Sequence, residues 1–329
     1  MRKRQFGRTG REVSEIGFGS WGIGGAQWVD VEDQQALDAL HAALDNGVTF
    51  IDTADVYGDG RSEQLIARAL SERRGERPYI ATKAGKRLPK QEVAGYTRHN
   101  LTAWIDRSLK NLRVDALDLV QLHCPPTELF YHPEVFGVLD DLAKDGKIRN
   151  YGVSVERVEE AIKAIEYPGV ASVQIIFNIL RQRPADLFFD LARNKNVAII
   201  ARVPLASGLL SGKFHKGSQF DPKDHRNFNR HGEAFDVGET FAGVPFDVGL
   251  EVVERLRPLV PGGATMAQFA LRWILMDEAV SVVIPGARSA EQARANALAD
   301  DLAPLAPEAM AKIKEIYDRD VRPHVHQRW

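Results

Sequence analysis

Four polar residues of types that transfer protons stand near the ends of three apolar runs. F-I-D-T-A-D-V-Y-G gives Asp52 and Tyr57, I-A-T-K-A-G gives Lys83, and V-Q-L-H-C gives His123. A tyrosine with an ordinary pKa of about 10 is a poor acid at neutral pH. A neighbouring ammonium lowers that pKa, a carboxylate holds the ammonium in place, and an imidazole can orient a carbonyl or share its proton. Together the four types fit proton transfer to a carbonyl oxygen.

Each of these residues also has a simpler interpretation when it is taken alone. Lys83 can be a solvated or salt-bridged residue at a strand end, and His123 can be a hydrogen-bonded histidine of the core. Asp52 can cap the turn that follows it. Their joint occurrence on three successive runs favours a common site, provided that the ends of these runs adjoin in space.

The three runs belong to a longer alternation of β-rich and amphipathic segments. The β-rich segments cover residues 13–19, 48–54, 79–85, 118–124, 150–155, 172–177, 197–203 and 281–286. Helical patterns cover residues 30–47, with Asp30 as N-cap and Asn46-Gly47 at the end, 62–75, starting with Ser62, and 97–112.

Eight such units without a break in composition predict one (β/α)8 TIM barrel domain over residues 1–329. In this fold the tops of consecutive strands adjoin, so the four polar residues can converge on one mouth. Residues 4–14 predict an N-terminal hairpin that turns at Thr9-Gly10 and plugs the barrel bottom. Residues 211–247 have no clear period and predict a long functional loop on the top face. A C-terminal helix and tail are expected to fold back toward the pocket or to meet another subunit.

The composition excludes several other classes of protein. The net charge of −2 over 329 residues gives no strong field to attract nucleic acid or an anionic membrane. Cys124 has no second cysteine to pair with, which fits a reducing compartment. The basic N-terminus has no apolar stretch after it, and no run approaches the roughly 20 apolar residues of a membrane helix. We therefore expect a cytoplasmic protein that binds neither nucleic acid nor membrane.

The stretch G-F-G-S-W-G, residues 17–22, has the G-x-G-x-x-G spacing of a Rossmann dinucleotide loop. That fingerprint needs a helix directly after the last glycine and an acidic residue at the end of the second strand. Here I-G-G-A-Q-W-V follows Gly22, and the acid at the right distance, Asp38, lies inside a predicted helix. We interpret the stretch as a turn after barrel strand 1 that lets the backbone approach a ligand.

The motifs F-I-D-T-A-D-V-Y-G, T-K and Q-L-H resemble those of the aldo-keto reductase family, and the resemblance runs over nearly the whole chain. It implies that Tyr57 is the general acid/base, that Lys83 lowers its pKa, that Asp52 pairs with Lys83, and that His123 orients the carbonyl. It also implies NADP(H), with NAD(H) as a possibility, bound across the barrel mouth. We expect no metal ion, because H-V-H near the C-terminus is too short a pattern to indicate a metal site.

The resemblance also assigns the cofactor contacts. Ser154 and Gln174 fall on the positions that bind the nicotinamide carboxamide, although Val155 replaces the asparagine that often follows. P-L-A-S-G-L-L-S-G-K resembles the pyrophosphate loop, and I-P-G-A-R-S-A-E-Q-A-R-A-N the adenosine site, where Arg288 would favour a 2′-phosphate. The predicted cofactor residues are Ser20, Trp21, Asp52, Ser154, Gln174, Arg202, Pro204, Leu205, Ser207, Lys213, Gly286, Ala287, Arg288, Gln292 and Asn296.

Arg202 departs from the family pattern, because many members stack an aromatic ring on the nicotinamide at this position. We hypothesise that its guanidinium stacks there and favours NADPH over the positively charged NADP⁺. The alternative is that Arg202 turns to a phosphate or a carboxylate.

The substrate is not fixed by these patterns. Trp21, Val56, Tyr57, Phe130 or Tyr131 and the loop phenylalanines suit an apolar or ring-shaped carbonyl compound. The histidines and arginines of residues 225–231 would equally meet a sugar, a quinone or a phosphate. Two alternatives to a reductase stay open: a cofactor-sensing regulatory subunit like the potassium-channel β subunits, and a different barrel enzyme that binds no nicotinamide. The oligomeric state is not readable from the sequence.

Overall fold

The computed structural model describes residues 1–25 and 31–329. The strands are β1 Lys3–Gln5, β2 Glu12–Ser14, β3 Phe18–Gly19, β4 Phe50–Asp52, β5 Tyr79–Ala84, β6 Leu117–His123, β7 Ile148–Ser154, β8 Val170–Ile176, β9 Ala198–Arg202 and β10 Val280–Val283. The α-helices are α1 Trp21–Gly24, α2 Asp33–Asp45, α3 Arg61–Ser71, α4 Arg98–Leu112, α5 Pro133–Lys144, α6 Val158–Ala164, α7 Phe188–Asn194, α8 His225–Phe228, α9 Phe246–Leu256, α10 Met266–Ile274, α11 Ala290–Ala297, α12 Pro307–Ile316 and α13 Arg322–Val325.

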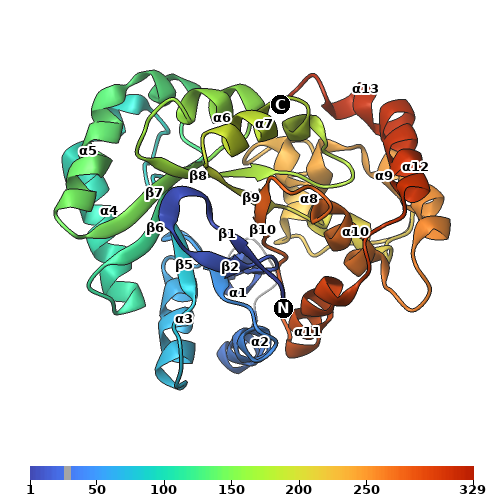
Figure 1. Cartoon of the computed structure of the whole chain (residues 1–329), viewed down its shortest axis with the longest axis horizontal. Helices are drawn as coiled ribbons and strands as arrows, with labels where there is room; N and C mark the ends of the chain where they lie inside the picture. Colours follow the sequence, from blue (N-terminus) through green and yellow to red (C-terminus); the bar gives the residue numbers. More distant parts are fainter. Residues whose placement is uncertain (26–30) are drawn as a thin grey trace.

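Strands β3 to β10 form one parallel sheet in sequence order, with helices around it (Figure 1). The sheet closes where the first and last strands meet, through bridges from Ile16 to Val283 and from Gly19 to Gly286. The Gly17 amide donates to the Val283 carbonyl at 2.8 Å across this seam. The predicted (β/α)8 barrel is confirmed, and the G-x-G-x-x-G stretch lies at its seam.

The seam explains a glycine of this stretch. A Cβ on Gly19 would lie 2.8 Å from the Ile284 carbonyl oxygen, too close for any other residue at that spacing. The motif therefore has a structural reason that is independent of a Rossmann loop.

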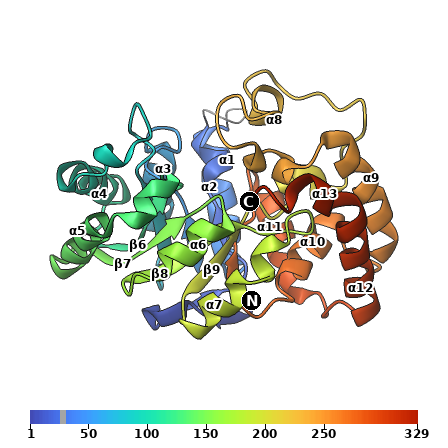
Figure 2. The same ribbon diagram turned by 90° about the horizontal axis from the view of Figure 1, so that it is seen from above.

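The predicted N-terminal hairpin is also confirmed, with β1 and β2 paired antiparallel. Phe6 and Val13 from the hairpin are fully buried against inward-facing residues of the barrel, including Phe50 and Tyr79. The Phe6 ring lies 5.2 Å from Phe50 and 5.3 Å from Tyr79, centroid to centroid. Figure 2 shows the hairpin at one end of the barrel and the loop that carries α8 at the other. The hairpin thus plugs the bottom and leaves the top for a site.

The helices follow the sequence patterns with small shifts. On α4, Leu101, Trp104, Ile105 and Leu112 are buried, and Thr97 caps the helix by accepting from the Asn100 amide. The start of α3 was predicted wrongly at Ser62. Gly60 in the left-handed region precedes Arg61, the first helical residue, and the Ser62 hydroxyl is used in the core instead.

The predicted N-cap of the helix now seen as α2, Asp30, lies outside the described residues. Within the part of the chain that the structure describes, no helix is long and apolar enough to cross a membrane.

The long loop after β9 contains short helical turns, among them η5 Ala206–Ser211, η6 Val237–Glu239 and η7 Phe241–Gly243. Aromatic rings of the loop form a cluster, in which Phe220 lies 5.1 Å from Phe214 and 5.8 Å from Phe241, a residue of the hydrophobic core. The Arg226 guanidinium lies 4.8 Å from the Phe220 ring centre, and Arg230 lies 5.2 Å from that of Phe246. The loop is therefore packed against the barrel, and these two arginines are part of its packing.

Candidate active site

The four predicted catalytic residues meet at the top of the barrel. Lys83, buried at the end of β5, donates from Nζ to Asp52 Oδ1 at 2.6 Å and to the Tyr57 hydroxyl at 3.1 Å. A third bond, at 2.9 Å, goes to the Thr53 carbonyl oxygen. Because all three ammonium protons have an acceptor, the position of the charge beside the phenol is fixed. The His123 ring lies edge-on to Tyr57, with 6.0 Å between ring centres.

Two glutamines support Asp52 from inside the barrel. Gln174 Nε2 donates to Asp52 Oδ2 at 2.7 Å, and Gln121 Nε2 lies 3.4 Å from the same oxygen. Gln174, predicted to bind the cofactor, therefore also supports the Asp52–Lys83 pair. No role was predicted for Gln121. Its signal in the sequence was the spacing Q-L-H, since residues two apart on a strand share a face.

The pKa of Tyr57 lies above its ordinary value of about 10. Desolvation raises the pKa of Tyr57 to about 12, while the charge of Lys83 lowers it by less. Lys83 lowers this pKa, as predicted, but desolvation of the phenolate is the larger effect, so the pKa is raised overall. Tyr57 therefore keeps its proton at neutral pH, which is the form that a proton donor needs.

Lys83 is charged and His123 is neutral beside Tyr57. Burial disfavours the ammonium, but Asp52 and Tyr57 more than compensate and raise the pKa of Lys83. For His123, burial and then Lys83 lower the pKa well below its ordinary value. Among the described residues, His123 Nδ1 has no hydrogen-bond partner. A neutral imidazole with an unused nitrogen can orient a carbonyl by hydrogen bonding, but it cannot supply a proton at neutral pH.

An aromatic wall stands next to this group. Between ring centres, the Trp21 ring lies 6.4 Å from Tyr57 in a stacked arrangement, 5.0 Å from His225 at a tilt, and 6.3 Å from Phe235 edge-on. Burial lowers the pKa of His225 to about 4, so this histidine is uncharged at neutral pH. Of the other expected wall residues, Phe130 is fully buried in the core and Tyr131 is exposed. The wall beside Tyr57 is therefore aromatic and uncharged.

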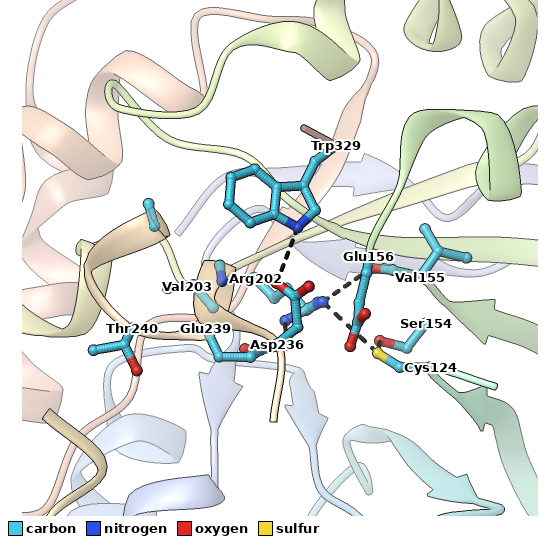
Figure 3. Close-up of polar contacts among 12 residues, drawn as sticks. Cys124, Ser154, Val155, Glu156, Arg202, Val203, Asp236, Glu239, Thr240 and Trp329 are labelled. Carbon is cyan, nitrogen blue, oxygen red and sulfur yellow. Dashed lines mark hydrogen bonds and ion pairs between the residues drawn. The ribbon is translucent and has the colours of Figure 1, made fainter. Parts of the chain in front are cut away.

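Arg202, at the end of β9, turns to a carboxylate. It forms an ion pair with Glu239, donates to the Val155 carbonyl oxygen at 2.9 Å and lies 3.7 Å from Cys124 Sγ (Figure 3). Ser154, predicted to bind the carboxamide, lies beside this group, with its Oγ 3.4 Å from Cys124 Sγ. Glu239 was missed from the sequence, because its loop has no period that would indicate where a side chain points.

A potential group of metal ligands surrounds the same guanidinium. In the described part of the chain, Cys124, Glu156 and Glu239 offer ligand atoms within 4.8 Å of one another. The Arg202 guanidinium already supplies the positive charge there. Of the two histidines of H-V-H, His326 is bound to Asp186 at 3.0 Å and to the Tyr317 hydroxyl at 2.9 Å.

The predicted pyrophosphate residues lie in and beside η5. Ser207 donates from Oγ to the Glu239 carbonyl oxygen at 2.9 Å and accepts from the Phe241 amide at 3.2 Å. The amides of Ala206 and Gly208 donate within the turn, to the carbonyls of Val203 and Leu205. Lys213 is exposed, Pro204 is buried and Leu205 is half-buried. The Ser207 hydroxyl thus holds the long loop in addition to any role toward a phosphate.

The predicted adenosine residues gather at the start of α11, next to the turn after β3. Asn296 Nδ2 donates to the Gly286 carbonyl oxygen at 3.1 Å, and the Arg288 amide donates to Gln292 Oε1 at 2.8 Å. A Cβ on Gly22 would lie 3.1 Å from the Arg288 side chain, so this glycine allows the two segments to touch. Ala287 is buried, and the buried Ser20 accepts from the Ser62 hydroxyl at 2.7 Å.

These residues fit a dinucleotide in two respects. The close approach at Gly22 brings the half-buried Arg288 beside α1, which carries Trp21. At the catalytic end of the mouth, Gln174 binds Asp52 and Ser154 lies opposite His123 on the neighbouring strand. A cation at one end and polar side chains at the other suit a ligand that has a phosphate group and a carboxamide.

The barrel and its Asp52–Lys83–Tyr57 group define an enzyme of the oxidoreductase kind. A sequence model of the Aldo/keto reductase family matches residues 15–318. The chain belongs to this family, and the resemblance stated from the motifs is confirmed.

Three similar proteins illustrate this relationship. The aldo-keto reductase YhdN of Bacillus subtilis is 29% identical over 291 residues, which cover 87% of this chain and 85% of the relative. A probable voltage-gated potassium channel subunit beta of Arabidopsis thaliana is 28% identical, and the match covers 96% of each chain. The holo form of aldo-keto reductase AKR11C1 from Bacillus halodurans superposes with a TM-score of 0.76 at 27% identity, again over 96% of each chain.

Proposed function

We propose that this chain is an NADP(H)-dependent reductase that converts an aldehyde or ketone to an alcohol. The observation that carries the proposal is the chain of contacts from Asp52 through Lys83 to the Tyr57 hydroxyl, at 2.6 and 3.1 Å. This arrangement puts a protonated phenol beside a fixed positive charge at the mouth of the barrel. Ser154, Gln174 and Arg288 would hold the cofactor, whose nicotinamide supplies the hydride when it is bound.

The protein's own residues account for the proton. His123 and Tyr57 orient the carbonyl oxygen of the substrate by hydrogen bonds. As negative charge develops on that oxygen, the Tyr57 proton moves to it, and the Lys83 ammonium stabilises the phenolate that is left. Asp52 keeps the ammonium in place through this step. Desolvation, which raises the pKa of Tyr57 to about 12, then favours return of a proton from water to the phenolate.

The wall of Trp21, His225 and Phe235 supports an uncharged, planar or ring-shaped carbonyl substrate. From the sequence, the arginines and histidines of residues 225–231 were candidates to bind a charged substrate. Arg226 is paired with Asp224, and the contacts of Arg226 and Arg230 with aromatic rings hold the loop. His225 is uncharged. A phosphate on the substrate would therefore find no dedicated cation in this wall, whereas an apolar ring would gain aromatic contacts.

The test is the loss of NADPH absorbance with the purified protein over aldehydes, ketones, quinones and sugars, with Tyr57→Phe as the control. Turnover that falls by about 10²-fold or more in the variant, with NADPH binding retained, supports the proposal. Aromatic aldehydes and quinones are expected to give higher kcat/KM than sugar phosphates. Turnover unchanged in Tyr57→Phe would contradict the assignment of the proton donor.

A regulatory subunit is the second candidate, because the Arabidopsis relative is named a potassium channel subunit beta. The intact catalytic group does not distinguish the two. Tight retention of NADPH with negligible turnover over the whole panel would favour the regulatory function, whereas rapid cofactor release with turnover would favour the reductase.

A further inference from the structure

Trp329 is docked in a slot above the barrel mouth. Only 4% of its surface is exposed, and its indole Nε1 donates to Asp236 Oδ1 at 2.9 Å (Figure 3). The guanidinium of Arg181 lies 3.7 Å from the centre of the indole ring. The Trp329 carbonyl oxygen also accepts from Arg183. Several different interactions therefore hold this one residue.

The slot is shaped for an indole ring. A Cβ on Gly243 would lie 2.5 Å from Trp329 Cη2, and a Cβ on Gly238 would lie 3.2 Å from Cε2. Arg181 forms one wall and donates to the Ala242 carbonyl oxygen at 3.2 and 2.9 Å. Trp329 and residues 236–243 thus pack as one unit.

The same turn carries Glu239 into the mouth. The Glu239 backbone is held by the Ser207 hydroxyl, and its carboxylate forms the ion pair with Arg202. Arg202 in turn binds the Val155 carbonyl oxygen, one residue beyond Ser154. A continuous set of contacts therefore leads from Trp329 through Asp236 and Glu239 to a guanidinium beside the predicted nicotinamide position.

The Arg202–Glu239 pair lies within electrostatic reach of the catalytic group. Desolvation, Lys83 and Asp52 have the larger effects on the pKa of Tyr57, and the negative charge of Glu239 also raises it. Burial, Lys83 and Lys86 have the larger effects on the pKa of His123, and the positive charge of Arg202 also lowers it. The pair places one positive and one negative charge in the mouth, and its orientation decides how far the two cancel there.

We propose that Trp329 is a positioning residue, which holds Glu239 so that its carboxylate neutralises Arg202 and sets the relative affinity for oxidised and reduced cofactor. The inference rests on the proposed function, since it places a nicotinamide beside Arg202. The oxidised ring carries a positive charge and the reduced ring does not. Neutralisation by Glu239 therefore removes the preference for NADPH that an unpaired Arg202 would produce.

The experiment measures the dissociation constants of NADPH and NADP⁺ by titration, together with Tm, for wild type and five variants. Glu239→Gln leaves Arg202 without its counter-charge and is expected to weaken NADP⁺ binding on the order of tenfold relative to NADPH. Trp329→Phe keeps a ring in the slot but loses the bond to Asp236. This variant is expected to shift the ratio of the NADP⁺ and NADPH dissociation constants in the same direction, by about threefold.

The double variant tests whether Trp329 acts through Glu239. If it does, adding Trp329→Phe to Glu239→Gln leaves the ratio at the value of Glu239→Gln alone. Arg202→Gln is expected to shift the ratio the opposite way, toward NADP⁺, because Glu239 then remains without a cation. Trp104→Phe, the same change at a buried tryptophan of α4, is the matched control and is expected to alter Tm but not the ratio.

The outcomes separate the two proposals. If wild type binds both cofactor forms but the ratio is unchanged in Glu239→Gln or in Trp329→Phe, the inference about Trp329 is overturned and the reductase proposal stands. A Trp329→Phe effect that persists fully in the double variant also overturns it. If wild type binds neither form, both proposals fail together.

Discussion

Asp52 and Asp55 are three residues apart, both are buried, and their surroundings differ. Asp52 is paired with Lys83 and supported by Gln174, whereas neither carboxylate oxygen of Asp55 has a hydrogen-bond partner among the described residues. Burial and then the charge of Glu63 raise the pKa of Asp55 to about 7. Two carboxylates of one short segment thus have different surroundings, because only Asp52 forms a direct ion pair with a cation.

We predict that Asp55→Asn stabilises the protein at and above neutral pH. A carboxyl group with a raised pKa contributes stability that is fully present below pH 3.8 and is lost as the pH rises through about 7. The amide does not titrate. The free energy of unfolding of the variant relative to wild type should therefore grow by about 1.4 kcal/mol per pH unit between these values and level off above them. Urea unfolding at a series of pH values measures this difference.

Asp59→Asn is the control for this series. The side chain of Asp59 is exposed, and bonds from Arg87 and the charge of Arg107 lower its pKa. Its contribution is present above its unfolded pKa, so the difference from wild type should stay flat between pH 5 and 8. A flat difference for Asp55→Asn as well would show that Asp55 is ionised in the folded protein.

The start of α11 is built by its own side chains. Ser289 caps the helix by accepting from the Gln292 amide, Gln292 binds the Arg288 amide, and Asn296 binds the Gly286 carbonyl. These bonds fix the backbone where Arg288 leaves the loop after β10. The guanidinium is thus carried on a rigid segment, which suits recognition of a phosphate group.

We predict that Arg288→Ala weakens NADPH binding about 10- to 100-fold while NADH binding changes little, because only NADPH has a 2′-phosphate for the guanidinium. Dissociation constants of both cofactors measure the effect. Arg294→Ala, an exposed arginine in the last turn of the same helix, is the control. Equal losses for NADPH and NADH in Arg288→Ala would remove the reason to favour NADP(H).

The elements of the barrel were predictable because their signals are local. Each of the eight β-rich runs contains a strand of the parallel sheet, and Asp52, Lys83 and His123 lie at or next to the ends of three of these strands. Residues at consecutive strand tops converge whatever the loops do, so the catalytic group followed from the fold class.

The contacts of the long loop were not predictable in the same way. The pairing of Arg202 with Glu239 spans 37 residues and that of Asp236 with Trp329 spans 93, and no period links either pair. The net pKa shift of Tyr57 also needed the structure, because it is a balance between desolvation and the neighbouring charges. The sequence showed that Arg202 was unusual but left both alternatives for its partner open.

In the molecule as a whole, the N-terminal hairpin connects the start of the chain to the segment that leads into β10, the last strand of the barrel. Arg4 of β1 donates to the carbonyl oxygens of Leu275, Asp277 and Val280 at 2.6 to 2.9 Å, and to Glu15 Oε2 at 2.9 Å. The three carbonyls lie just before and at the start of β10, the strand that closes the sheet against β3. One side chain therefore connects the bottom plug to the seam of the barrel.

We predict that Arg4→Ala lowers the free energy of unfolding by about 3 kcal/mol, since several buried carbonyls and Glu15 lose a charged donor. The kcat should stay within about twofold, because the hairpin lies at the opposite end from Tyr57. Lys3→Ala, at an exposed cation of the same strand, should cost less than about 0.5 kcal/mol. Chemical denaturation and steady-state kinetics check both values. A large loss of kcat in Arg4→Ala at a temperature where it is folded would show that the plug influences the mouth.

The fit between Gly243 and the indole ring restricts how the two positions can change during evolution. Any side chain at position 243 would occupy the volume that Trp329 now fills, and the backbone there has a φ of +79°. A descendant that lost Trp329 would lose the steric reason for glycine at 243, although the backbone conformation would still favour it. A descendant that gained a side chain at 243 would first have to release the tryptophan. Substitutions at the two positions are therefore expected to arise together among descendants of this chain, with the loss of the tryptophan coming first.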